Sequence, residues 1–188
     1  MAEAWPFSFT IVVNNGDLVP DTEKLFNSYN QPSINDDGIV VFRARSQGGD
    51  GQPATGIFLG DLSGSPIEAI TVRGGTVPDP NNLEASFNEF PSFPRIDAAS
   101  DLVSFRGQSN PVWEYVVEPP QDVLAFEAEP ADDNGEEETT RIGTSGVYSN
   151  FNGSLITGLS QLGVVDGFSY FSVPGTDPPL RFDQFPGA

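Results

Sequence analysis

Carboxylates are the side chains of this sequence with the greatest capacity for chemistry, because the chain contains neither histidine nor cysteine. Histidine is the commonest general base and transition-metal ligand, and thiolates act as nucleophiles and zinc ligands. Ser–His, Cys–His and imidazole–zinc chemistry are therefore excluded, and so are disulfide bonds. The chemistry that remains is that of two opposed acids in a glycosidase, or of oxygen ligands around a calcium ion.

Adjacent carboxylates occur in three places, at Asp36–Asp37, Asp132–Asp133 and Glu136–Glu138. A glycosidase needs two carboxyl groups roughly 5–9.5 Å apart, facing each other across a sugar. Neighbouring positions in the chain do not set that separation, and acids this frequent usually lie in solvent. The sequence therefore predicts no enzymatic activity and no catalytic residues.

Calcium binding is a better-supported role for one of these stretches. Asp132, Asp133 and Glu136 place hard oxygen ligands around Gly135, as calcium loops do. The spacing is not that of an EF-hand, which needs ligands at alternate positions and a late glutamate. Because the stretch is highly charged and poor in apolar residues, a flexible acidic loop is the alternative interpretation. No other cofactor is predicted.

The charge balance excludes two classes of partner. Asp and Glu number 27 against 8 Lys and Arg, which gives a formal net charge of -19. Such a surface repels nucleic acid and anionic membranes but keeps the protein soluble and attracts cations. No apolar run approaches the roughly 18–20 residues of a membrane-spanning helix, so we expect neither nucleic-acid binding nor membrane insertion. Because residues 1–5 do not resemble a leader, we expect either an intracellular protein or a mature form whose leader was removed.

Internal similarity indicates a repeated unit. Residues 26–29 (FNSY) recur as 87–90 (FNEF) and as 182–185 (FDQF). Thr10–Val13 similarly matches Ile70–Arg73, and further matches follow in the same order along the chain. The spacing predicts a repeat of about 60 residues.

Each unit is expected to contain four short strands, because short apolar or alternating stretches are bounded by Gly, Pro, Asn or Asp. Within one copy of the pattern these strands are predicted at Phe26–Tyr29, Ile39–Arg45, Gly56–Gly60 and Ile67–Arg73. The next copy of the pattern, which begins at about Phe87, is longer. Its additional residues are predicted to form a hairpin from two further strands, Val112–Val117 and Val123–Glu127.

These features predict an all-β fold in which antiparallel sheet repeats form β-propeller-like blades, with a sandwich or solenoid as the alternative. The 20 Gly, 17 Pro and 15 Phe residues fit many turns and aromatic packing. We predict one repeat domain over 1–188, with a partial unit at about 1–31, a second at 32–93 and a third at 94–188. The third carries an acidic insertion at 108–143. The set of blades is expected to be incomplete, or completed by oligomerisation.

Residues 34–42 (INDDGIVVF) resemble the signature of the NxxGxxAF (choice-of-anchor) tandem-repeat family of exported bacterial proteins. Asn35, Gly38 and Phe42 occupy the named positions, and Val41 stands where alanine is typical. The second copy, 97–105, has serine in place of the glycine and one extra residue. The resemblance implies an extracellular or cell-surface protein without a defined activity, although no anchor is visible in the sequence.

The named positions also have a physical interpretation. Asn35 and Gly38 suit a tight turn in which the amide caps the backbone and the glycine takes a positive φ. Phe42 then lies on the inward face of the next strand. Residues 152–154 (NGS) fit an N-glycosylation acceptor, but Asn-Gly also favours a turn, which is the interpretation adopted.

The function predicted from the sequence is that of an extracellular structural or interaction protein. Self-association through open strand edges would produce an oligomer or filament. The alternative is a carbohydrate-binding module, assisted by calcium, in which Trp113 and Tyr115 stack on a glycan. Core packing is the competing role for those two rings.

Overall fold

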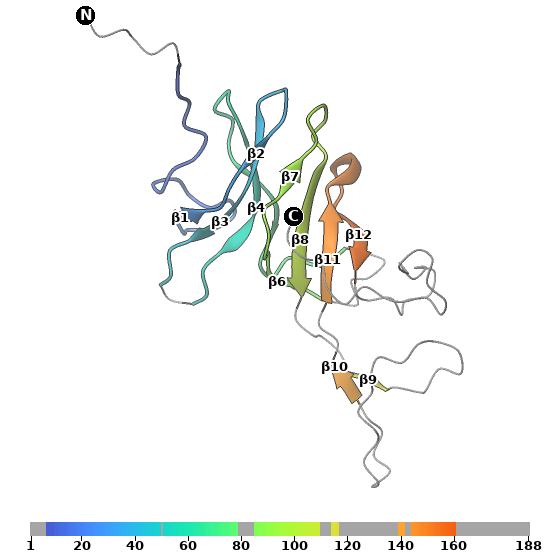
Figure 1. Cartoon of the computed structure of the whole chain (residues 1–188). Helices are drawn as coiled ribbons and strands as arrows, with labels where there is room; N and C mark the ends of the chain where they lie inside the picture. The colour runs from blue at the N-terminus through green and yellow to red at the C-terminus, as the bar shows by residue number, and fades with distance from the viewer. Residues whose placement is uncertain are drawn as a thin grey trace, which may run out of the picture. The chain divides into compact units, whose positions relative to one another are not determined.

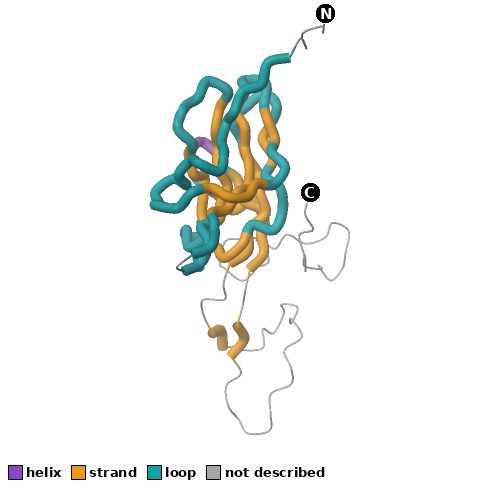
Figure 2. The backbone as a smooth tube through the Cα atoms, turned by 90° about the vertical axis from the view of Figure 1, so that its left-hand side faces the viewer, coloured by secondary structure: helices purple, strands orange, loops and turns teal. Residues whose placement is uncertain are grey.

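The computed structural model describes residues 7–49, 51–78, 85–109, 114–116, 139–141 and 144–160. Within these ranges the regular structure is antiparallel β-sheet, together with one short 3₁₀ turn, η1 (Phe151–Gly153) (Figure 2). The predicted all-β class is confirmed.

The first sheet is an antiparallel meander. Its strands follow the chain in the order β1 (Phe26–Tyr29), β3 (Ile39–Ser46), β4 (Thr55–Asp61) and β5 (Glu68–Val72), and the short β2 (Ser33–Ile34) pairs with β3 (Figure 1). These four main strands are the four predicted within one copy of the pattern, with ends that differ by at most one residue. Clear alternation and turn-forming boundaries made them visible in the sequence.

The second sheet has the same strand order. Its strands are β6 (Phe87–Glu89), β8 (Val103–Ser109), β11 (Thr144–Ser149) and β12 (Ile156–Ser160), and the short β7 (Arg95–Ile96) pairs with β8. Each sheet therefore consists of a four-stranded meander, with a two-residue strand paired to the second strand of that meander.

The irregularities of pairing also coincide. In the first sheet a β-bulge interrupts the pairing of β1 with β3 between Phe26 and Ser28, and the second sheet has one between Phe87 and Glu89. The third and fourth strands of each meander carry another bulge, adjoining Phe58 in one sheet and Tyr148 in the other. Bulges are specific local features rather than random defects, so their coincidence extends the match beyond strand order.

A third, two-stranded sheet pairs β9 (Glu114–Val116) with β10 (Thr139–Arg141). It belongs to the segment between β8 and β11, where the insertion was predicted. The first predicted hairpin strand, Val112–Val117, contains β9, whereas the second, Val123–Glu127, lies outside the described residues. The partner that the structure gives to β9 was not predicted.

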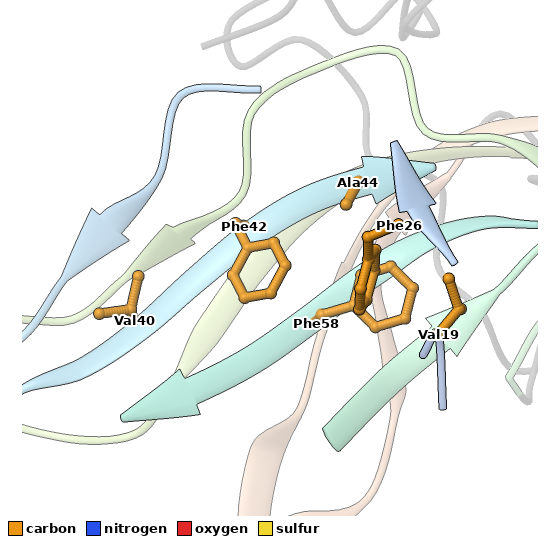
Figure 3. Packing of buried hydrophobic residues seen from close by; sticks show 6 residues of the cluster. All are labelled: Val19, Phe26, Val40, Phe42, Ala44 and Phe58. Carbon is orange, nitrogen blue, oxygen red and sulfur yellow. The ribbon is translucent and has the colours of Figure 1, made fainter. Parts of the chain in front are cut away.

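The core of the first sheet is aromatic. Alternate residues of β3 point to one face, where they meet Phe58 of β4 and Phe26 of β1. The buried cluster consists of Val19, Phe26, Val40, Phe42, Ala44 and Phe58 (Figure 3). Phe26 is the centre of the ring contacts, because its centroid lies 5.8 Å from Tyr29, 6.2 Å from Phe42 and 5.1 Å from Phe58.

The second sheet repeats this ring arrangement with Phe87, Phe90, Phe105 and Tyr148. Phe87 lies 5.4 Å from Phe90, 6.3 Å from Phe105 and 4.8 Å from Tyr148. The edge-to-face contact of Phe26 with Phe58 has an interplanar angle of 88°, and that of Phe87 with Tyr148 has one of 89°. Edge-to-face packing is a favoured geometry for aromatic pairs, and it recurs here at matching positions.

Tyr29 in the aromatic cluster of the first sheet corresponds to Phe90 in that of the second sheet, so the effect of replacing this tyrosine by phenylalanine can be predicted. Among the described residues the buried Tyr29 hydroxyl has no hydrogen-bond partner. Burial, with a smaller contribution from Asp17, raises the pKa of this hydroxyl. Tyr29→Phe should therefore increase the free energy of unfolding by about 1 kcal/mol, because an unsatisfied polar group is removed. Urea denaturation measures this change, and a loss of stability would contradict the packing described.

The chain divides into two compact units. Residues 1–72 with 93–103 form the first, and residues 73–92 with 104–188 form the second. The predicted single repeat domain and its boundaries stay a prediction.

Candidate functional site

The turn before β3 is organised by Asn35, which has only 6% of its surface exposed. The Gly38 amide donates to the Asn35 carbonyl at 3.1 Å, and Gly38 has a φ of +79°. The Ile39 amide donates to Asn35 Oδ1 at 2.8 Å, so the side chain caps the start of the strand. Phe42 is buried in the core four residues after Gly38. The predicted turn-and-core role of the Asn35, Gly38 and Phe42 positions is confirmed.

The side-chain NH₂ group of Asn35 contacts a second loop of the same unit, residues 97–102. Asn35 Nδ2 donates to the Ser100 carbonyl at 3.2 Å and to Asp101 Oδ1 at 3.1 Å. Beside it, the Asp36 amide donates to the Ala98 carbonyl at 2.9 Å. A single buried amide therefore closes its own turn and joins it to a loop more than sixty residues later.

The partner loop has a related construction around Asp97. The Asp97 amide donates to the Leu102 carbonyl at 2.9 Å, just as the Asn35 amide donates to the Ile39 carbonyl at 3.0 Å. The Asp97 carboxylate accepts from the Ala99 amide and from the Ser100 hydroxyl. An ionised carboxylate can only accept hydrogen bonds, whereas the side-chain amide of Asn35 also donates them through Nδ2. The bond between the loops therefore depends on asparagine at position 35.

The predicted calcium ligands Asp132, Asp133 and Glu136 lie outside the described residues. Within the described part of the chain, no group of three or more Asp and Glu residues is arranged to hold a metal ion. The acids Asp36 and Asp37 are both exposed. The calcium hypothesis and the acidic-loop alternative therefore stay predictions.

Asp61 organises an exposed turn after β4. Its Oδ1 accepts from the Ser63 hydroxyl at 2.7 Å, the Ser63 amide at 2.8 Å and the Ser65 amide at 3.1 Å. Hydrogen bonds from Ser65 and Ser63 lower the pKa of this carboxyl below its usual range. Bonds of this kind are typical of Asx turns, so a turn-forming role accounts for them.

Exposed apolar side chains form the surface feature that the sequence analysis did not identify. Phe7 is 68% exposed, Phe9 94% and Ile11 74%. A second group lies at the start of the last described strand, where Phe151 precedes β12 and is 51% exposed, and Ile156 begins β12 and is 37% exposed. An alternating apolar pattern without charges was the available signal, but only coordinates show which apolar residues are left uncovered.

Both exposed groups fall in uncharged parts of an acidic chain. Residues 4–16 and 142–165 contain no Asp, Glu, Lys or Arg, and they are the two longest such stretches in the sequence. Among the described strands β12 is the last of its sheet, and it lies within the second stretch. β5 ends the other sheet but begins with the exposed Glu68 and is followed by Arg73. Natural edge strands commonly carry charges that discourage pairing, and β12 has none.

The η1 turn contains Asn152, whose φ is +51°. The residue is exposed, and the turn predicted for the Asn-Gly sequence is confirmed. Among the predicted sugar-stacking residues, Trp113 lies outside the described part of the chain and Tyr115 lies in β9.

Comparisons with known proteins place the chain within a family. A family model described as a family of unknown function (DUF7453) matches residues 5–112. Neither the curated proteins nor the solved structures gave a match. The family match does not test the resemblance to the NxxGxxAF family, which stays a prediction. In the described residues, no helix has the length and apolar content needed to cross a membrane.

Proposed function

The chain belongs to the DUF7453 family of unknown function, and from its sheet edges we propose that it is a structural or interaction protein whose copies join through unpaired strands. The observation that carries this proposal is the uncharged strand β12, which is at the edge of its sheet among the described residues, in a chain with a net charge of -19. β12 begins with the exposed Ile156 and follows the exposed Phe151. An edge strand without charged side chains offers a row of backbone donors and acceptors to another chain.

The proposed building block is a repeated four-stranded blade of the β-propeller kind. Support comes from the shared strand order, the coincident bulges and the matching ring arrangement of the two sheets. A consecutive antiparallel meander of four strands is the arrangement of a propeller blade. Closed propellers have about 4–8 blades, so further copies would supply the remaining sheets.

An extracellular or cell-surface location forms part of the proposal. It rests on the resemblance of Asn35, Gly38 and Phe42 to the signature of an exported repeat family. The acidic surface agrees with a protein that must stay soluble at high local concentration until it assembles. No described residue favours the carbohydrate-binding alternative, so it stays a prediction.

The test is the mass of the full chain in solution, measured by light scattering after gel filtration over a range of concentrations. We expect species at multiples of 20.1 kDa and discrete rings or filaments in negative stain. Raising the salt from 0.1 M to 1 M shortens the Debye length from about 10 Å to about 3 Å, so association between acidic copies should strengthen. A monomer at every concentration and salt would contradict the proposal.

A further inference from the structure

The N-terminal segment, Phe7–Val13, has the sequence of a strand but is not one in the structure. Phe7, Phe9 and Ile11 alternate with Ser8 and Thr10, which is the period of a strand with one apolar face. Residues 7–11 are exposed and have no strand partner among the described residues, and the segment leads away from the first sheet (Figure 1).

One end of this segment is fixed to the fold. Val12 and Val13 pack against the core of the first sheet. Val12 lies so close to Gly60 of β4 that a Cβ at Gly60 would stand 2.6 Å from a Val12 methyl group. The exposed residues 7–11 therefore project from an anchored base, and a segment held in this way loses less entropy on pairing than a free tail.

Sequence similarity indicates what the segment can form. Thr10–Val13 matches Ile70–Arg73, and the matching residues include most of β5, which pairs antiparallel with β4. The same kind of sequence is therefore a paired strand in one place and an unpaired segment in the other. Phe9, at 94% exposed, would gain apolar burial on pairing.

The distribution of charge indicates which strand of a second copy could accept the segment. Two copies that each carry a net charge of -19 repel each other, so contact is least costly where neither surface has charged groups. The segment and β12 lie in the two longest uncharged stretches of the chain. The exposed Ile156 at the start of β12 and the exposed Phe151 before it supply apolar surface for the segment's aromatic rings.

We propose that Phe7–Val13 of one copy adds as a strand to the outer edge of β12 in a second copy. The inference rests on the proposed function, because it names the donor and the acceptor of that self-association. Main-chain hydrogen bonds supply the affinity, and the alternating Phe7, Phe9 and Ile11 side chains set the register.

Substitutions in the donor provide the first part of the test. Thr10→Pro removes one backbone donor, and Phe9→Asp places a charge on the apolar face. Both positions are exposed, so the fold should be unaffected. Each variant should raise the dissociation constant between copies at least about tenfold in sedimentation velocity. Leu62→Asp, at a 49% exposed turn, is the matched charge control and should change it less than about threefold. Donor variants that associate like the native chain would overturn the inference.

Cross-linking identifies the acceptor, because the chain contains no cysteine of its own. Ser8→Cys is mixed with Gly158→Cys on β12 or with Glu68→Cys on β5, all at exposed positions. A disulfide in these mixtures can form only between copies. We expect a covalent pair with Gly158→Cys. A pair with Glu68→Cys instead would overturn the choice of β12 and leave edge-mediated assembly standing, whereas association without either pair would overturn strand donation.

Discussion

Phe26→Ala and Phe87→Ala should each lower the free energy of unfolding of their unit by about 3–5 kcal/mol. Each ring is 1% exposed and contacts three other aromatic rings of its own sheet. Truncation removes the buried surface of the ring and leaves a cavity that a sheet with fixed strand spacing cannot close.

The equality of the two losses is the informative result, because the rings occupy matching places in two sheets. Phe151→Ala, at a half-exposed ring, is the control and should cost less than about 1 kcal/mol. Urea denaturation, followed by far-ultraviolet circular dichroism, measures the free energy of unfolding of all three variants. A large loss for one core substitution and almost none for the other would contradict the matched packing.

Asn35→Asp should destabilise the first unit by about 3 kcal/mol at neutral pH. The substitution keeps an acceptor for the Ile39 amide but removes the donor to the Ser100 carbonyl and to Asp101. It also sets a carboxylate against the Asp101 carboxylate, which raises the pKa of the introduced group. Because protonation restores a donor and removes the repulsion, the penalty is present above that raised pKa and shrinks as the pH falls through it.

Two further variants separate the lost bond from a general effect of charge. Asn152→Asp makes the same change at an exposed turn and should alter stability by less than about 0.5 kcal/mol. Adding Asp101→Asn to Asn35→Asp returns a donor to the pair and should recover about 1 kcal/mol in a double-mutant cycle. The absence of any coupling between positions 35 and 101 would contradict the contact.

The first sheet was predictable because its signals are local. Val40, Phe42 and Ala44 lie at alternate positions of one strand, on the face that packs into the aromatic core, and turn-forming residues bound that strand. The turn at Asn35 and Gly38 was equally visible. The bond from Asn35 to Ser100 was not, because it joins residues 65 positions apart and no sequence pattern specifies that encounter.

The remaining elements show what local patterns omit. β10 follows three glutamates and consists of Thr139–Arg141, which contains no apolar residue to identify it as a strand. Phe7–Ile11 has the opposite character, because its pattern is that of a strand although no described strand pairs with it. A strand needs a neighbour to satisfy its backbone, and sequence alone does not say which chain supplies that neighbour.

Amide hydrogen exchange of the native chain, measured at concentrations below and above assembly, tests most directly whether backbone edges join the copies. If donated strands hold them together, Phe7–Val13 and β12 should become protected at the same concentration, by about tenfold or more in exchange rate. Rapid exchange of both segments in fully assembled material would show that the copies meet through other surfaces.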